Sequence, residues 1–154
     1  MSEARDFHLH RELWLPRPRD EVFAFFADAR NLEQITPGFL RFQMLTPGPV
    51  DMRVGARIEY RIRLRGLPLR WESEITAWEP GARFVDEQRR GPYRRWVHEH
   101  HFAERDGGTL VTDDVRYAVP GGRLVNRLFV QPDLERIFDY RHAKMREILG
   151  ARAA

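Results

Sequence analysis

The sequence contains no cysteine and only one lysine, Lys144, and it has no long hydrophobic run. Without cysteine the protein can form no disulfide, no cysteine-ligated zinc site and no thiol nucleophile. No segment approaches the roughly 18 apolar residues that a membrane-spanning helix requires. Glu3, Arg5 and Asp6 also interrupt the N-terminal segment, where a signal peptide would need an apolar stretch. We therefore expect a cytoplasmic protein without a transmembrane segment.

Because lysine is nearly absent, arginine supplies the positive charge. Lysine and arginine together number 26 against 23 acidic residues, which gives a formal net charge of +3. The arginines alternate with acids along the chain and form no basic tail or stripe, which is typical of a solvated surface and argues against nucleic-acid binding. A chain of 154 residues with 42% hydrophobic residues suits one globular domain over residues 1–154.

Alternating polar and apolar residues predict strands in most of the chain. Residues 7–15 place Phe7 and Leu9 on one face and His8 and His10 on the other, as a half-buried strand requires. Residues 55–65 alternate between isoleucine, tyrosine or leucine and charged residues. Further strands are predicted at 39–45, 69–78, 83–88, 93–102 and 109–119, separated by turns rich in glycine and proline. Successive strands with such short connections are expected to be antiparallel neighbours.

Helical spacing appears in two places. After Pro18, the acids Asp20 and Glu21 suit the first turn of a helix that carries Val22 and two phenylalanines, and residues 31–35 predict a second short turn of helix. Near the C-terminus one apolar stripe, broken only by Arg141, predicts a long helix that ends near residue 149. The stripe consists of Leu134, Ile137, Phe138, Met145, Ile148 and Leu149. A curled antiparallel sheet that grips such a helix can leave a cavity between them.

Five segments resemble the SRPBCC or START-like helix-grip superfamily, and specifically its cyclase/dehydrase-type ligand-binding branch. They are PRPRDEVFAFFAD (16–28), NLEQITP (31–37), RWESEITAWEPGARFVDEQRRGPYRRWVHEHHF (70–102), TDDVRYAVPGG (112–122) and IFDYR (137–141). The resemblance covers almost the whole chain. It implies an α+β helix-grip fold, with a seven-stranded curved antiparallel sheet around a long C-terminal helix. It also implies a hydrophobic cavity for a small ligand such as a lipid, a polyketide or an isoprenoid-like compound, and no cofactor.

Extending the alternation along the later strands gives the set of residues expected to face the cavity. The predicted ligand-binding set is Tyr60, Trp71, Ile75, Phe84, Asp86, Gln88, Trp96, His98, His100, Phe102, Asp113, Tyr117, Phe138, Arg141 and Met145. It combines a large aromatic wall with a polar band. Buried polar groups without partners cost roughly 1–3 kcal/mol each, so the band must bond internally, to water or to a ligand.

Several roles are open for the band at the sequence level. His98 and His100 can brace the sheet with an aspartate, orient the polar atoms of a ligand, or act with Asp113 as a general base in a polyketide cyclase or dehydratase. Histidines two apart on a strand can also chelate zinc, but no third ligand stands at a diagnostic spacing, so we predict that no metal is needed. Carriage of a ligand is the favoured function, and the enzyme is the alternative.

Two further features have competing interpretations. Arg141 either extends to an edge of the protein or turns its guanidinium into the cavity, where it could hold a carboxylate or phosphate. His8 and His10 repeat the two-residue spacing on the expected outer face of the first strand, where an ordinary solvent-exposed role is favoured.

Overall fold

The computed structural model describes residues 6–150, which form one curved antiparallel sheet and a long C-terminal helix. The strands are β1 (Phe7–Leu15), β2 (Gln43–Met44), β3 (Arg57–Leu64), β4 (Leu67–Glu79), β5 (Arg83–Arg90), β6 (Arg95–Arg105) and β7 (Gly108–Ala118). They form a seven-stranded sheet in the order β1-β7-β6-β5-β4-β3-β2. The predicted fold class is confirmed. Residues 39–45 are the exception among the predicted strands.

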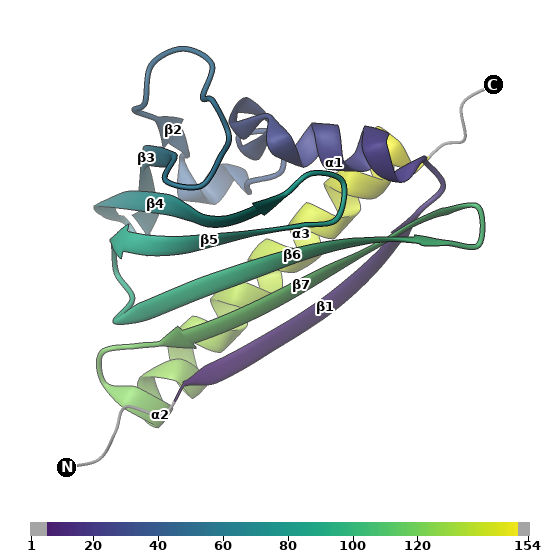
Figure 1. Cartoon of the computed structure of the whole chain (residues 1–154). Coiled ribbons are helices and arrows are strands. Elements are labelled where there is room, and N and C mark those ends of the chain that lie inside the picture. Colours follow the sequence, from purple (N-terminus) through teal and green to yellow (C-terminus); the bar gives the residue numbers. More distant parts are fainter. Residues whose placement is uncertain (1–5, 151–154) are drawn as a thin grey trace.

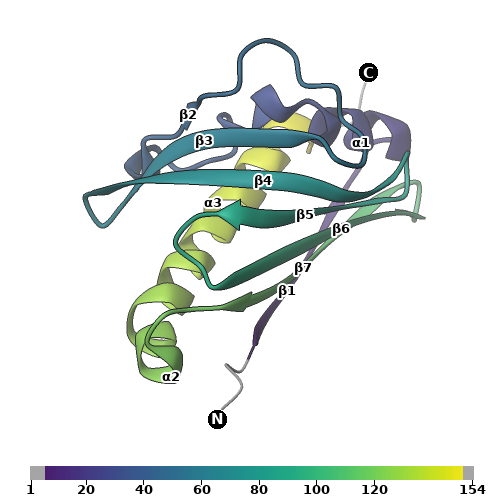
Figure 2. The same cartoon turned by 60° about the vertical axis from the view of Figure 1, so that its left-hand side comes forward.

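The helices lie between β1 and β2 and after β7. They are α1 (Arg19–Ala27), the 3-10 turns η1 (Ala29–Leu32) and η2 (Gly38–Leu40), α2 (Gly122–Val125), the π-helical turn η3 (Asn126–Val130) and α3 (Gln131–Leu149). Figures 1 and 2 show α3 running diagonally across one face of the sheet, with α1 near its C-terminal end and α2 at its N-terminal end. None of the helices within residues 6–150 combines the length and hydropathy that a bilayer-spanning segment requires.

Two hairpins show how turn chemistry fixes the register of the sheet. Arg65 and Gly66 connect β3 to β4 with φ of 50° and 81°, and Asp106 and Gly107 connect β6 to β7 with φ of 49° and 75°. Positive φ at both central residues is what the type I′ hairpin turn demands. The resulting β6–β7 register pairs His98 with Val115, so the inward residues of neighbouring strands lie side by side.

The sheet bends where β4 pairs with β5. The register shifts between Glu72 and Ser73 and again between Ile75 and Ala77, and such bulges increase local twist and bend the strand. Figure 2 shows the sheet arching over α3. The bend lets one face of the sheet wrap the apolar stripe of α3, whose Phe138 and Met145 are each only 1% exposed.

One strand prediction is wrong in most of its length. Residues 39–45 alternate like a strand, but Gly38–Leu40 forms the turn η2 and only Gln43–Met44 pairs with β3. Arg41 has a φ of 47°, and this left-handed conformation turns the chain out of any extended path. The predicted second helical turn at 31–35 is also displaced, because the observed turn η1 spans Ala29–Leu32.

Candidate functional site

A cavity lies between the concave face of the sheet and α3. Its volume, measured as the space open to the centres of water molecules, is about 160 Å³. Strands β3 to β6 and α3 form its walls, and the segment from α1 to η2 closes one side through Phe25, Phe26, Leu32 and Leu40. A single water needs only about 10–15 Å³ of such space, so the cavity can take a molecule many times larger.

Aromatic side chains make up much of the wall. The rings of Tyr60 and Trp71 are stacked with centroids 5.8 Å apart, and Trp71 meets Trp96 edge-on at 5.3 Å. Tyr93 packs against Trp96 at 4.8 Å. Burial raises the pKa of the Tyr60 and Tyr93 phenols, so both are neutral at physiological pH. This aromatic part of the wall is therefore uncharged, which suits an apolar ligand.

Two histidines and two aspartates form a closed cluster at one end of the cavity. His98 Nε2 lies 2.7 Å from Asp113 Oδ1, and His100 Nε2 lies 2.7 Å from Asp86 Oδ2. The other ring nitrogens approach the opposite carboxylates, with His98 Nδ1 at 4.0 Å from Asp86 and His100 Nδ1 at 3.6 Å from Asp113. We call these four residues the inner His–Asp cluster. Asp86, His98 and His100 line the cavity, whereas Asp113 lies behind the histidines.

Ring stacking holds the inner His–Asp cluster in place. The His98 and His100 rings are stacked with centroids 3.7 Å apart, and Phe84 stacks on His100 at 4.0 Å. Phe138 from α3 lies 5.7 Å from the His98 ring. The imidazoles are thus packed between aromatic rings and fixed by carboxylates, which leaves them little rotational freedom.

The electrostatics of the inner His–Asp cluster favour ionised aspartates and a neutral His100. Burial alone would raise the pKa of Asp113, but contacts with His142 and His98 outweigh burial and hold that pKa below its usual range. Burial would likewise raise the pKa of Asp86, and the His100 hydrogen bond with nearby positive charge lowers it instead. Burial and the neighbouring His98 lower the pKa of His100, so its imidazole is neutral at pH 7.

Arg141 lines the cavity from α3. Its guanidinium lies 5.2 Å from the centre of the Phe138 ring, and its positive charge helps to lower the pKa of Asp86. Its buried Nε has no hydrogen-bond partner within residues 6–150. A guanidinium at a cavity wall is suited to a carboxylate or phosphate group of a ligand.

Ten of the fifteen residues predicted to face a ligand line the cavity. These are Tyr60, Trp71, Ile75, Phe84, Asp86, Trp96, His98, His100, Phe138 and Arg141. Their role in ligand binding is still a prediction. The other five do not line the cavity, because hydrogen bonds or core packing occupy their side chains.

Two of the five are taken up by hydrogen bonds. Gln88 lies beyond the last β5–β6 pair, Glu87 with Val97, and its side chain bonds the backbone of Tyr93 in the connecting turn through both its oxygen and its nitrogen. Asp113 bonds to His98 behind the cavity wall. In both cases the strand periodicity correctly predicts the face of the sheet on which the residue lies. It does not reveal the hydrogen-bond partner of the side chain.

The other three pack into the core. Phe102 contacts the rings of Phe23 and Phe26, because α1 covers this end of β6. Met145 joins the same core cluster near the end of α3. Tyr117 donates its hydroxyl hydrogen to Asn126 Oδ1 at 2.9 Å, so η3 covers that end of β7.

Sequence reasoning missed two groups of residues. Phe25, Phe26 and Leu32 line the cavity from α1 and η1, whereas the sequence pattern only placed the two phenylalanines at helical spacing. His142 was missed altogether, and its Nε2 lies 3.6 Å from Asp113 Oδ2. Its position in α3, four residues after Phe138 and three before Met145, would have placed it on the inward stripe.

The inner His–Asp cluster also contains a set of potential metal ligands. One ligand atom from each of Asp86, His98 and His100 lies within 4.8 Å of the others. The two rings are nearly parallel, however, with 23° between their planes. Ring nitrogens present their lone pairs in the ring plane, so stacked rings direct them side by side and not toward one ion. The geometry therefore favours hydrogen bonding over metal binding here.

Comparisons with known proteins agree with this architecture. The protein is similar in structure to CV1439 from Chromobacterium violaceum, with a TM-score of 0.73, 14% identity, and 96% of this chain and 98% of that chain covered. It is similar to Ms6760 from Mycobacterium smegmatis, with a TM-score of 0.69, 19% identity, and 92% and 90% covered. A ginseng major latex-like protein from Panax ginseng gives 0.68, 14% identity, and 94% and 97%. These likenesses establish the fold.

Among curated protein sequences, none matches this chain. A family model described as "Polyketide cyclase / dehydrase and lipid transport" matches residues 15–141, which run from the end of β1 well into α3 and include every residue of the inner His–Asp cluster. The chain therefore belongs to the polyketide cyclase/dehydrase and lipid transport family.

Proposed function

We propose that the protein binds or carries a small hydrophobic or amphipathic molecule, such as a lipid, a polyketide or an isoprenoid-like compound, in the cavity between the sheet and α3. The observation that carries the proposal is the cavity itself, of about 160 Å³ and walled largely by aromatic and aliphatic side chains. Water in such a space forms few hydrogen bonds, and replacing it by an apolar ligand gains roughly 25 cal/mol for each Å² buried.

The polar groups of the cavity orient the bound ligand. Asp86 accepts a hydrogen bond from His100, and Arg141 contributes a positively charged side chain to the cavity lining. These groups lie at one part of a wall that is otherwise apolar or aromatic. A ligand with an oxygen-bearing end and a hydrophobic body satisfies both parts, whereas a wholly polar ligand would leave the aromatic wall in contact with water.

The test measures occupancy of the cavity with a fluorescent probe, 1-anilinonaphthalene-8-sulfonate. Ile62 lines the cavity from β3 and is only 7% exposed, so Ile62→Trp should fill the space and abolish saturable fluorescence enhancement. Leu124 is 67% exposed on α2 and does not line the cavity, so Leu124→Ser should leave the enhancement unchanged. Equal binding by the Ile62→Trp variant, folded as judged by circular dichroism, would contradict the proposal.

A second candidate function is a polyketide cyclase or dehydratase. The observation that favours it is the hydrogen-bonded His100–Asp86 pair at the cavity surface, whose histidine has a lowered pKa and is neutral at pH 7. A neutral imidazole held by a carboxylate is a general base suited to removing a proton next to a carbonyl group. Conversion of a bound polyketide, followed by mass spectrometry, distinguishes this function from carriage.

A further inference from the structure

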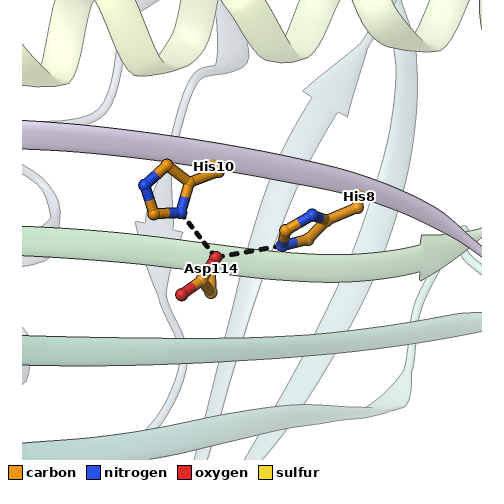
Figure 3. A group of neighbouring side chains, drawn as sticks. All are labelled: His8, His10 and Asp114. Atoms are coloured by element: carbon orange, nitrogen blue, oxygen red, sulfur yellow. Dashed lines mark hydrogen bonds and ion pairs between the residues drawn. The ribbon is translucent and has the colours of Figure 1, made fainter.

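A second histidine cluster lies on the outer face of the sheet, away from the cavity. His8 and His10 leave β1 on this face, and Asp114 of β7 stands directly opposite His10 in the strand register. Figure 3 shows both imidazoles turned toward the Asp114 carboxylate. His8 Nε2 lies 2.9 Å and His10 Nδ1 lies 2.7 Å from the same oxygen, Oδ1. Three potential metal ligands therefore converge on one point.

The shape of this cluster differs from that of the inner His–Asp cluster. The His8 and His10 rings are 6.3 Å apart and tilted by 52°, so their in-plane lone pairs can point to a common ion. One ligand atom from each of His8, His10 and Asp114 lies within 4.8 Å of the others. The histidine side chains are about half exposed, at 54% and 47%. They can therefore close on an ion that arrives from solvent.

Further carboxylates surround the same point. Glu12 Oε1 lies 3.3 Å from His10 Nε2, and Glu99 of β6 pairs with Asp114 in the β6–β7 register. One ligand atom from each of Glu99, His101 and Asp114 also lies within 4.8 Å of the others. Three acidic side chains around two imidazoles attract a divalent cation electrostatically. The sequence pattern favoured an ordinary solvent-exposed role for His8 and His10. The third ligand, Asp114, comes from β7 through strand pairing, so the spacing of the histidines along the chain does not reveal it.

We propose that His8, His10 and Asp114 bind a divalent transition-metal ion of the Zn²⁺ class on the outer face of the sheet. Imidazole nitrogen and carboxylate oxygen are ligands that Zn²⁺ prefers, and three protein ligands leave a coordination position for water or a further group. The ion replaces the hydrogen bonds that the two imidazoles share with Asp114. Because β1 is an edge strand, the ion ties this edge to β7. The site is independent of the cavity and of any ligand in it.

The experiment uses the full chain without a histidine tag, stripped of metal with EDTA and titrated with ZnCl₂ by calorimetry. We expect one ion per chain and a zinc-dependent rise in melting temperature that EDTA reverses, because a ligand that binds only the folded state stabilises it. His10→Ala and Asp114→Asn should each weaken binding by more than tenfold, since losing a hydrogen-bond partner of a metal ligand already costs roughly 10–100-fold.

Asp51→Asn is the matched control, because Asp51 lies between β2 and β3, belongs to none of these ligand groups and is 84% exposed in its side chain. It should bind zinc like the wild type. Circular dichroism of the metal-free variants checks their folding, and a His8→Asn variant tests the third ligand independently. Absence of saturable zinc binding, full binding by a His8→Ala/His10→Ala double variant, or a loss in Asp51→Asn equal to that in Asp114→Asn would each overturn the proposed site.

Discussion

Asp113 and Asp114 are consecutive residues of β7, and their carboxylates contact histidines on opposite faces of the sheet. Asp113 lies 2.7 Å from His98 Nε2 on the inner face, and Asp114 lies 2.7 Å from His10 Nδ1 on the outer face. The Asp113 side chain is 5% exposed and that of Asp114 is 28% exposed. The two aspartates therefore occur in environments that differ in burial. Comparing them tests directly what burial contributes to the free energy of unfolding.

Replacing either aspartate by asparagine should have very different effects on stability. Asp113→Asn removes the charged partner of the buried His98 hydrogen bond, and a hydrogen bond to a charged group contributes about 1.5–3 kcal/mol. Asp114→Asn changes an exposed pair, for which about 0–1 kcal/mol is usual. Urea denaturation of both variants in the presence of EDTA measures the difference. Equal losses of the free energy of unfolding would mean that the inner His–Asp cluster contributes nothing beyond a surface pair.

The contribution of His100 to the stability of the protein should rise with pH between about pH 5 and pH 7. The native pKa of His100 is lowered from 6.5, so in this range the unfolded chain binds more protons at this residue than the native chain, and this contribution to the free energy of unfolding increases with pH. Asp86 and Asp113 have lowered pKa values. Their contribution is therefore fully present above about pH 4 and is lost as the pH falls further.

Denaturation curves at several pH values check this dependence. A His100→Gln variant cannot titrate at this position and should show a flatter profile between about pH 5 and pH 7. His101 is the next residue of β6 and its side chain is 39% exposed, so His101→Gln serves as the control and should parallel the wild type. A His100→Gln profile as steep as that of the wild type would show that another group governs the dependence.

The sequence predicts those parts of the fold that depend on local pattern. Residues 7–15 match β1 because polar and apolar residues alternate over most of the segment, with Arg11 as an exception on the apolar face, and the last helix ends at Leu149 because its apolar stripe ends there. Residues 39–45 fail because Arg41 adopts a positive φ, which alternation cannot reveal. Within residues 6–150, the local pattern therefore breaks down where a single backbone conformation redirects the chain.

The candidate site is less predictable, because it depends on partners from distant elements. The strand period correctly placed His98 and His100 on the inner face, where both are buried. It did not show that Asp113 would lie behind them or that Gln88 would bond to Tyr93. These outcomes depend on where neighbouring strands end and on which helix covers them.

His100→Gln also separates carriage of a ligand from catalysis. If His100 only supports the polar end of the cavity, glutamine should weaken ligand binding by no more than one hydrogen bond, about 0.5–1.5 kcal/mol or up to about tenfold in affinity. If His100 is a general base, binding should persist while turnover falls by roughly 10²–10⁴. Titration of the bound compound into both proteins, with its chemical fate followed by mass spectrometry, gives both quantities. We expect unchanged ligand and a modest loss of affinity; conversion that disappears in the variant would establish the enzyme.

Arg141 should select ligands that carry an acidic end. Arg141→Met keeps a long apolar side chain but removes the unpaired donor. A hydrogen bond to a charged group contributes about 1.5–3 kcal/mol, so affinity for a fatty acid should fall by roughly tenfold to a hundredfold. Affinity for the corresponding fatty alcohol should change little, and it serves as the internal control. Equal losses for both probes would show that Arg141 acts by packing and not by recognising charge.

Native mass spectrometry of the freshly purified protein tests the central claim most directly. We expect a fraction of the wild-type protein to carry one small molecule that is released on denaturation and is largely hydrophobic, with an oxygen-bearing end. The Ile62→Trp variant, whose added indole fills the cavity, should carry none, while Leu124→Ser should carry the same molecule as the wild type. The same bound molecule at equal occupancy in the Ile62→Trp variant would contradict a ligand site between the sheet and α3. So would a wild-type protein that stays empty and binds no lipid, polyketide or isoprenoid compound on addition.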